Sequence, residues 1–119
     1  MSTPLRLSDL SSARQALVRL CQEMNYGSIE NLEIRDCEPM FNPPPTVVWD
    51  VKLDSEESAR PETALPDFIV SKEILRLIRH LDEIKLGKFR RVEVRAGIPR
   101  RILMESRRSG SAEPPTKYR

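Results

Sequence analysis

The sequence has few of the residues that most often carry chemistry. It contains one histidine, two cysteines and four glycines in 119 residues. His80 therefore has no second histidine to act with, and two cysteines with one histidine are a poor set of zinc ligands. The chain also lacks a glycine-rich phosphate loop and the common hydrolase and zinc-protease motifs. We therefore expect no enzyme activity, no metal and no cofactor.

Aromatic residues and long apolar runs are also scarce. Aromatic residues make up 5% of the chain, which predicts a core of aliphatic side chains. No apolar run approaches the roughly 20 residues that span a bilayer, and the first residues lack the apolar stretch of a secretory signal. Two cysteines without such a leader are typical of a reducing compartment. The sequence therefore predicts a cytoplasmic protein with no membrane segment.

Charged residues are abundant, at 32% of the chain, but they are unevenly distributed. Residues 1–60 hold 10 acids and 6 bases, a net charge of −4, whereas residues 61–119 hold 8 acids and 14 bases, a net charge of +6. Such asymmetry indicates an anionic partner or head-to-tail self-association. A solvated basic face without a partner fits equally well.

One stretch of the chain occurs twice. A shift of 60 residues places residues 11–39 on residues 71–99, so that Gly27 coincides with Gly87. Most mismatches exchange one apolar residue for a similar one. Each copy has the order helix, glycine, strand, tight turn, proline. Because one helix with one hairpin is too small to be stable alone, we expect the two copies to share one core.

The spacing of apolar residues predicts the elements of each copy. A helical spacing indicates two helices, and a strict alternation indicates four strands. The helices are predicted at 8–25 and 71–85, and the strands at 28–35, 46–53, 89–95 and 98–105. Gly27 and Gly87 are predicted to end the helices. The alternation around Trp49 is the clearest in the chain and directs that side chain into the core.

These elements predict an α+β fold: a duplicated α-β-β unit whose hairpins merge into a four-stranded antiparallel sheet, with two helices on one face. We expect a single domain over residues 1–105, made of repeats at about 8–53 and 67–105, followed by a disordered basic tail at 106–119. A pseudo-twofold axis would relate the repeats. The repeat also predicts positive φ at Cys37, which coincides with a glycine of the second copy.

Two proline-containing segments connect the predicted elements. The polar segment 54–66 is typical of a mobile loop. The segment 39–46 contains three consecutive prolines and predicts a rigid connector. A proline-rich ligand for a partner domain is the alternative interpretation of that segment.

The run Tyr26-Gly27-Ser28-Ile29-Glu30, followed by Ile34-Arg35-Asp36 after an amphipathic helix, resembles the YezD-like family of short bacterial proteins. The resemblance covers the first copy and, more faintly, the second. The chain departs from the family at Cys37, where the family's turn has glycine, and by one extra strand residue. The resemblance implies a helix paired with a hairpin, and it implies no activity.

The titratable residues have structural interpretations that we prefer to catalytic ones. His80 is expected at the surface, Cys21 in the core as a small apolar residue, and Cys37 at an exposed hairpin tip. A nucleophile would require one of the cysteines beside His80, and the spacing gives no reason to expect it.

Glu33 and Glu93 coincide in the repeat. Near a pseudo-twofold axis they could form an acid–base pair. The preferred alternative is that the first strands of the two copies pair antiparallel, centred near Ile34 and Val94. In that register Glu33 faces Arg95 and Arg35 faces Glu93, as two exposed ion pairs.

Basic residues gather on the second hairpin. They are Lys88, Arg90, Arg91, Arg95, Arg100 and Arg101. Such residues attract phosphates, but single-strand binding usually adds stacking aromatic residues, and only Phe89 and Tyr118 are nearby. We therefore expect a non-catalytic binding or accessory module that acts through an unknown protein partner or self-association, at the open face or edges of its sheet. Nucleic-acid binding by the basic hairpin is the alternative.

Overall fold

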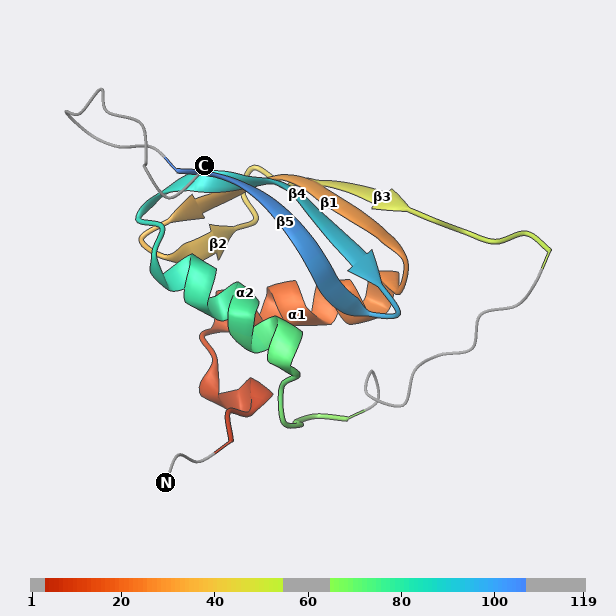
Figure 1. Cartoon of the computed structure of the whole chain (residues 1–119), viewed down its shortest axis with the longest axis horizontal. Helices are drawn as coiled ribbons and strands as arrows, with labels where there is room; N and C mark the ends of the chain where they lie inside the picture. The colour runs from red at the N-terminus through yellow and green to blue at the C-terminus, as the bar shows by residue number, and fades with distance from the viewer. Residues whose placement is uncertain (1–3, 55–64, 107–119) are drawn as a thin grey trace.

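A computed structural model of the chain describes residues 4–54 and 65–106. Within these residues, two helices and a five-stranded antiparallel sheet form two layers, with both helices on the same side of the sheet (Figure 1). The elements in chain order are α1 (Ser12–Met24), β1 (Gly27–Arg35), β2 (Glu38–Met40), β3 (Thr46–Trp49), α2 (Lys72–Asp82), β4 (Leu86–Arg95) and β5 (Ile98–Ser106). A short 3-10 helix, η1 (Leu7–Asp9), precedes α1. The predicted α+β class is confirmed.

The sheet has five strands rather than the predicted four. β1 and β4 lie at its centre, and β5 forms one edge. The short strands β2 and β3 both pair with β1 along its other side, β2 with residues 33–35 and β3 with residues 27–30. β2 is not predicted from the sequence, because Pro39 lies in the middle of that strand and interrupts the pattern of an ordinary strand.

The central strands β1 and β4 pair antiparallel, as predicted for the first strands of the two copies, but the predicted register is wrong. Glu33 lies opposite Lys88 rather than Arg95, and Arg35 lies opposite Leu86 rather than Glu93. The two predicted ion pairs therefore do not form.

Burial of apolar side chains explains the observed register. Ile29 lies opposite Val92 and Leu32 opposite Phe89, and none of these four side chains is exposed to solvent. Burial of each such side chain stabilises the fold by about 1.5–3 kcal/mol. An exposed cross-strand ion pair contributes only a few tenths of a kcal/mol. The apolar pairs therefore decide the register.

Serines cap the beginnings of both helices. The hydroxyl of Ser11 accepts a hydrogen bond from the backbone N–H of Arg14, and the hydroxyl of Ser71 accepts one from Ile74. The first helix begins later than predicted, because the chain is extended at Ser11 after the 3-10 turn.

The glycines predicted to end the helices lie in strands instead. α1 ends at Met24 and is followed by Asn25, whose φ is +67°, and α2 ends at Asp82. Gly27 and Gly87 each lie where a neighbouring strand comes close. A Cβ on Gly27 would stand 2.0 Å from the carbonyl oxygen of Val48, and one on Gly87 would stand 2.2 Å from that of Glu105. Both glycines therefore allow close strand pairing.

Two-residue turns join β1 to β2 and β4 to β5. Asp36 and Cys37 have φ of +51° and +66°, and Ala96 and Gly97 have φ of +56° and +75°. The prediction of positive φ at Cys37 is confirmed. Turns of this kind match the twist of the strands that they join.

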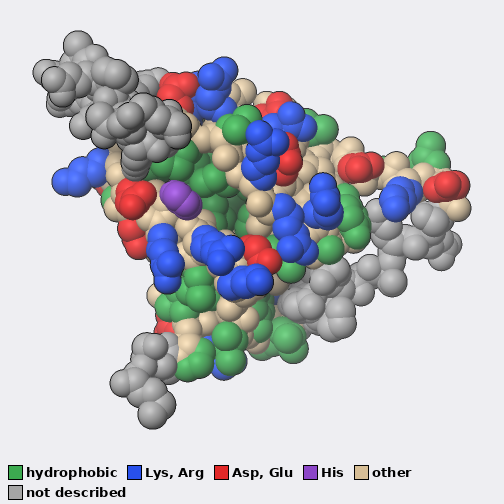
Figure 2. All heavy atoms as spheres, viewed as in Figure 1, with side chains coloured by type: hydrophobic (Ala, Val, Ile, Leu, Met, Phe, Trp, Pro, Cys, Tyr) green, Lys and Arg blue, Asp and Glu red, His purple; other side chains and the backbone are tan. Residues whose placement is uncertain are grey.

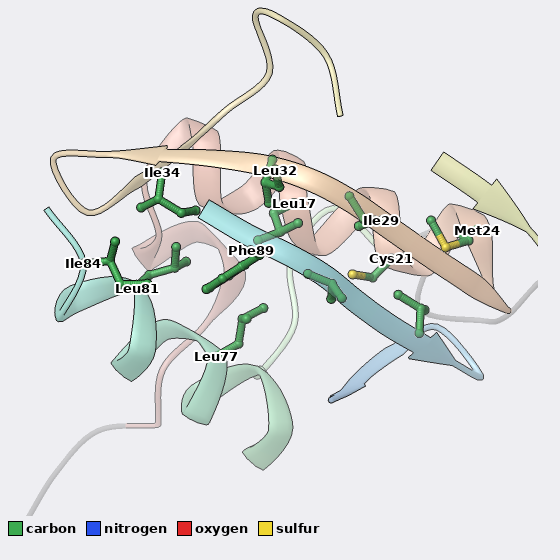
Figure 3. Packing of buried hydrophobic residues seen from close by; sticks show 12 residues of the cluster. Leu17, Cys21, Met24, Ile29, Leu32, Ile34, Leu77, Leu81, Ile84 and Phe89 are labelled. Atoms are coloured by element: carbon green, nitrogen blue, oxygen red, sulfur yellow. The ribbon is translucent and has the colours of Figure 1, made fainter. Parts of the chain in front are cut away.

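The main core lies between the helices and the sheet, and Figure 3 shows its side chains meeting from both layers. Leu17 and Cys21 of α1 and Leu77 and Leu81 of α2 enter it, and Phe89 of β4 lies between them. A second cluster joins α1, α2 and the N-terminal segment; its members are Leu7, Leu10, Val18, Val70, Ile74 and Ile78.

Trp49 is not in the core, and that prediction is wrong. Its side chain is 48% exposed, at the last residue of β3. β1 begins at Gly27, directly opposite Trp49, so the sheet ends there and the helices do not cover the tryptophan. β3 is accordingly shorter than the predicted strand 46–53.

Several predictions lie outside the described residues. Most of the predicted loop 54–66 and residues 107–119 of the predicted tail belong to this group. Ser106, the first residue of the predicted tail, is instead the last residue of β5. No described helix has the length and apolar character needed to cross a bilayer.

Candidate functional site

The free edge of β5 is the first feature of the site. Within the described residues β5 pairs only with β4. The pairing is irregular at Arg100, because Val94 lies opposite Pro99 whereas Glu93 lies opposite Arg101. Beyond this bulge, residues 101–106 follow β4 to its beginning. An edge strand presents N–H and C=O groups that another strand can pair with.

A groove lies directly beside this edge, between β5 and α2. Its volume is about 210 Å³, and its lining residues are Glu73, Arg76, Leu77 and His80 of α2 with Pro99, Arg100, Arg101 and Ile102 of β5. Leu77 and Ile102 contribute apolar surface, and both belong to the main core or pack against it. Figure 2 shows hydrophobic side chains beside the single histidine, with Lys and Arg side chains next to them. The groove thus combines apolar surface with a basic border.

One ion pair joins the two walls of the groove. Arg100 Nη1 donates to Glu73 Oε2 at 3.1 Å, which ties the bulge of β5 to the first turn of α2. The pKa of Glu73 is lowered, first by a hydrogen bond from its own backbone N–H and then by the charge of Arg100. Glu73 is therefore ionised at neutral pH, and it offsets the charge of Arg100.

His80 lies on the rim of the groove and not in a catalytic arrangement. Its side chain is exposed as predicted, and Nδ1 lies 3.8 Å from Glu83 Oε1 on the same helix. Within the described part of the chain neither cysteine is hydrogen-bonded to His80: Cys21 is fully buried, which raises its pKa to about 12. Cys37 is half-buried rather than exposed, because its Sγ donates to the carbonyl oxygen of Asp82 at 3.3 Å.

The two repeat-related glutamates are not brought together. Glu33 lies opposite Lys88, and Glu93 lies opposite Ser28. Positions 28 and 33 of β1 are about 17 Å apart at the usual rise of a strand, so the two carboxylates do not form an acid–base pair. Residues 4–54 and 65–106 also contain no group of three or more His, Cys, Asp or Glu side chains that could hold a metal ion.

The six basic residues of the second hairpin do not form one continuous basic surface. Four of them are paired with acids: Arg90 with Glu105, Arg91 with Glu93 and Glu30, Arg100 with Glu73, and Arg101 with Glu93. Lys88 and Arg95 form no ion pair with any described residue. Phe89 is fully buried, so the nearby ring is not available for stacking on a base.

Sequence reasoning missed part of the groove. Arg76 and Leu77 lie in a predicted helix and Ile102 in a predicted strand, and only the packing of α2 beside the free edge makes them neighbours. The spacing of apolar residues does not indicate which strand lies at an edge of the sheet. Comparisons of the chain with family models, with curated proteins and with solved structures give no match.

Proposed function

We propose that this protein is a non-catalytic binding module that takes an extended segment of a partner protein along the free edge of β5. The observation that carries the proposal is the position of the groove directly beside that edge. In strand addition the backbone hydrogen bonds supply affinity, and pockets for alternate side chains supply specificity. Residues 101–106 offer the backbone groups, and the groove offers the pocket.

The charge of the groove favours an acidic segment with alternating apolar residues. Glu73 is held by Arg100, so Arg76 and Arg101 remain as the main charges at the border. Arg101 lies 3.9 Å from Glu93 and is 65% exposed, which leaves its guanidinium open to a further carboxylate. Complementary charge at a rim chiefly raises the association rate and selects the partner.

We also infer that the chain arose by duplication of an α-β-β unit. The register of the central strands supports this inference: Gly27 lies opposite Val94 and Ile34 opposite Gly87, and the 60-residue shift converts each pair into the other. The second strands of the two units differ, since β2 has three residues and β5 has nine. The longer edge is the one that carries the groove.

Nucleic-acid binding through the basic hairpin is the alternative proposal. Lys88 and Arg95, which have no acidic partner among the described residues, support it. It predicts a gel shift of single- or double-stranded DNA or RNA in low salt that disappears as salt rises. A shift abolished by Lys88→Ala with Arg95→Ala, and retained in Arg76→Glu, favours this alternative over peptide binding.

The proposed compartment is the reducing cytoplasm. Both cysteines of the described structure are free thiols, Cys21 in the core and Cys37 in a turn. Free thiols are typical of that compartment.

Backbone NMR with a probe peptide tests the proposed function. The probe is an eight-residue peptide of alternating valine and aspartate, titrated into the labelled full chain. We expect chemical-shift changes and slower amide exchange along 101–106 and on the groove face of α2. Changes confined to the open face of the sheet, or no changes at millimolar peptide, would refute the proposal.

A matched pair of substitutions controls for net charge. Arg76→Glu and Arg79→Glu change the charge equally, and both side chains are exposed on α2, but only Arg76 lines the groove. We expect Arg76→Glu to weaken binding of the acidic peptide by about tenfold and Arg79→Glu by much less. Equal effects would show that the peptide responds to overall charge and not to the groove.

A further inference from the structure

From Trp49, the last residue of β3, the chain carries exposed apolar side chains at every second position. We call residues 46–53 the β3 arm. Trp49 is 48% exposed, Val51 66% and Leu53 95%. Residues 46–49 pair with β1, and the backbone N–H of Asp50 donates to the carbonyl oxygen of Tyr26 at 2.9 Å. The chain then runs away from the sheet (Figure 1). Such a row of large apolar side chains at a strand spacing is unusual on a free surface.

We propose that the β3 arm of one copy of this protein occupies the β5 edge and groove of a second copy. This inference rests on the proposed function, and it names the partner of that site as another molecule of the same chain. Val47 packs against the main core in its own copy, whereas Trp49, Val51 and Leu53 are free to enter the groove of the other.

Strand geometry makes the arm a suitable occupant. Residues two apart in a strand point to the same face, so Trp49, Val51 and Leu53 would all face the apolar surface of Leu77 and Ile102. The outer side of β3 is not paired within the described residues, so β5 of another copy can extend the same sheet there. The arm and the open edge at 101–106 are also similar in length.

Charge complementarity supports the same pairing. The arm and the residue after it contain Asp50, Lys52 and Asp54, a net charge of −1. Asp50 and Asp54 alternate with Trp49, Val51 and Leu53, so in the joined sheet they lie on the opposite face. Arg101 lies on that same face of β5, because it alternates with Ile102. The two halves of the chain differ in charge in the same sense: residues 1–60, which contain the arm, have a net charge of −4, and residues 61–119, which contain the residues of the groove, have a net charge of +6.

The topology requires that this contact join two molecules. β3 lies on the outer side of β1, and β5 lies on the outer side of β4, so the arm and the groove are at opposite edges of one sheet. An arm therefore does not reach the groove of its own chain. A contact between two different surfaces is head-to-tail, and it gives closed rings or chains of molecules.

Two complementary variants of the full chain test the inference. Trp49→Asp places a charge in the apolar row of the arm and leaves the groove unchanged. Arg76→Glu with Arg101→Glu reverses the charge at the groove and leaves the arm unchanged. We expect the wild type to self-associate with rising concentration in sedimentation velocity, and each variant to associate at least about tenfold more weakly. In an equimolar mixture, the intact arm of the Arg76→Glu, Arg101→Glu variant can bind the intact groove of the Trp49→Asp variant. The mixture should therefore form a one-to-one complex.

Val48→Asp is the matched control for the arm. Val48 is 45% exposed and adjacent to Trp49, but it points to the other face of β3. It should associate like the wild type. Circular dichroism confirms that every variant is folded before its association is compared.

Two results would overturn the inference: a wild type that stays monomeric at millimolar concentration, or variants that stay apart when mixed. Peptide binding by the Trp49→Asp variant distinguishes failure of the self-association proposal from failure of the proposed function. If it binds the valine–aspartate peptide along 101–106 while the wild type remains monomeric, the edge binds peptides and the arm is not its partner. If it binds no peptide, the proposed function fails as well.

Discussion

The guanidinium of Arg14 lies 2.7 Å from the carboxylate of Asp82, and this ion pair joins α1 to the end of α2. Arg14 also donates to the carbonyl oxygen of Cys37 at 2.9 Å, and its Nε lies 3.1 Å from Glu38 without the alignment of a hydrogen bond. Its side chain is only 13% exposed. One arginine thus links both helices to the turn between β1 and β2.

Arg14→Gln should lower the free energy of unfolding by about 1–3 kcal/mol, because it leaves partly buried acceptors without their charged donor. Arg79→Gln is the control: Arg79 is exposed on α2 and should change stability by less than about 0.5 kcal/mol. Urea unfolding of both variants measures the difference. Equal stabilities would show that solvent already weakens the Arg14 contacts to the level of an ordinary surface pair.

A second prediction compares two aromatic residues of opposite exposure. Phe89→Ala should cost about 3–5 kcal/mol, because the ring is completely buried between the layers. Trp49→Ala should cost less than about 1 kcal/mol, because half of its side chain already lies in water. Chemical unfolding at low micromolar concentration provides the comparison. A cost for Trp49 as large as that for Phe89 would place the tryptophan in the core.

This contrast also shows how far the sequence predicts the fold. Periodicity found both helices and the central strands, because burial leaves a regular pattern in residues such as Leu17, Leu77 and Val92. The same pattern misplaced Trp49, because alternation reports which residues share a face and not whether anything covers that face. A strand that runs past the end of its neighbour has the same alternation as one in a core.

The candidate site was less accessible to sequence reasoning. The basic residues of the second hairpin were found, but their acidic partners were not, since Glu73 and Glu105 reach Arg100 and Arg90 only after folding. The predicted register failed for a related reason. That register depends on the attraction between the charges of Glu33 and Arg95, which is weaker than the burial of apolar pairs.

A third prediction concerns the turn between β4 and β5. Ala96 has a φ of +56°, which costs an alanine roughly 1 kcal/mol and suits asparagine. Ala96→Asn should therefore raise the free energy of unfolding by about 0.5–1 kcal/mol. The same substitution at Ala16, exposed in α1, should lower it by about 0.5 kcal/mol, because asparagine is a poorer helix former. Changes of the same sign in thermal melting would contradict the assigned turn conformation.

The last prediction concerns acid stability. Asp67, which precedes α2, is hydrogen-bonded to Arg6 and Ser8 of the N-terminal segment. Its carboxylate accepts from Arg6 Nε at 2.8 Å and from the backbone N–H of Ser8 at 2.9 Å. These hydrogen bonds, first that of Arg6, lower the pKa of Asp67 from 3.8 to about 2. Because the folded pKa is below the unfolded one, the contribution of Asp67 is complete above about pH 4 and is lost as the pH falls to about 2.

Asp67→Asn isolates this contribution, since the other carboxylates titrate in both proteins. We expect the wild type to melt at a higher temperature than the variant at neutral pH, and the two melting temperatures to converge between about pH 4 and pH 2. Asp50→Asn, in the exposed segment after β3, is the control for the removal of one acidic charge at neutral pH, and it should change the melting temperature less than Asp67→Asn does. A constant difference in melting temperature between wild type and Asp67→Asn down to pH 2 would mean that the substitution acts by changing packing and not by removing the charge. In that case the segment would be held by Leu7 and Leu10 in the second cluster and not by the carboxylate.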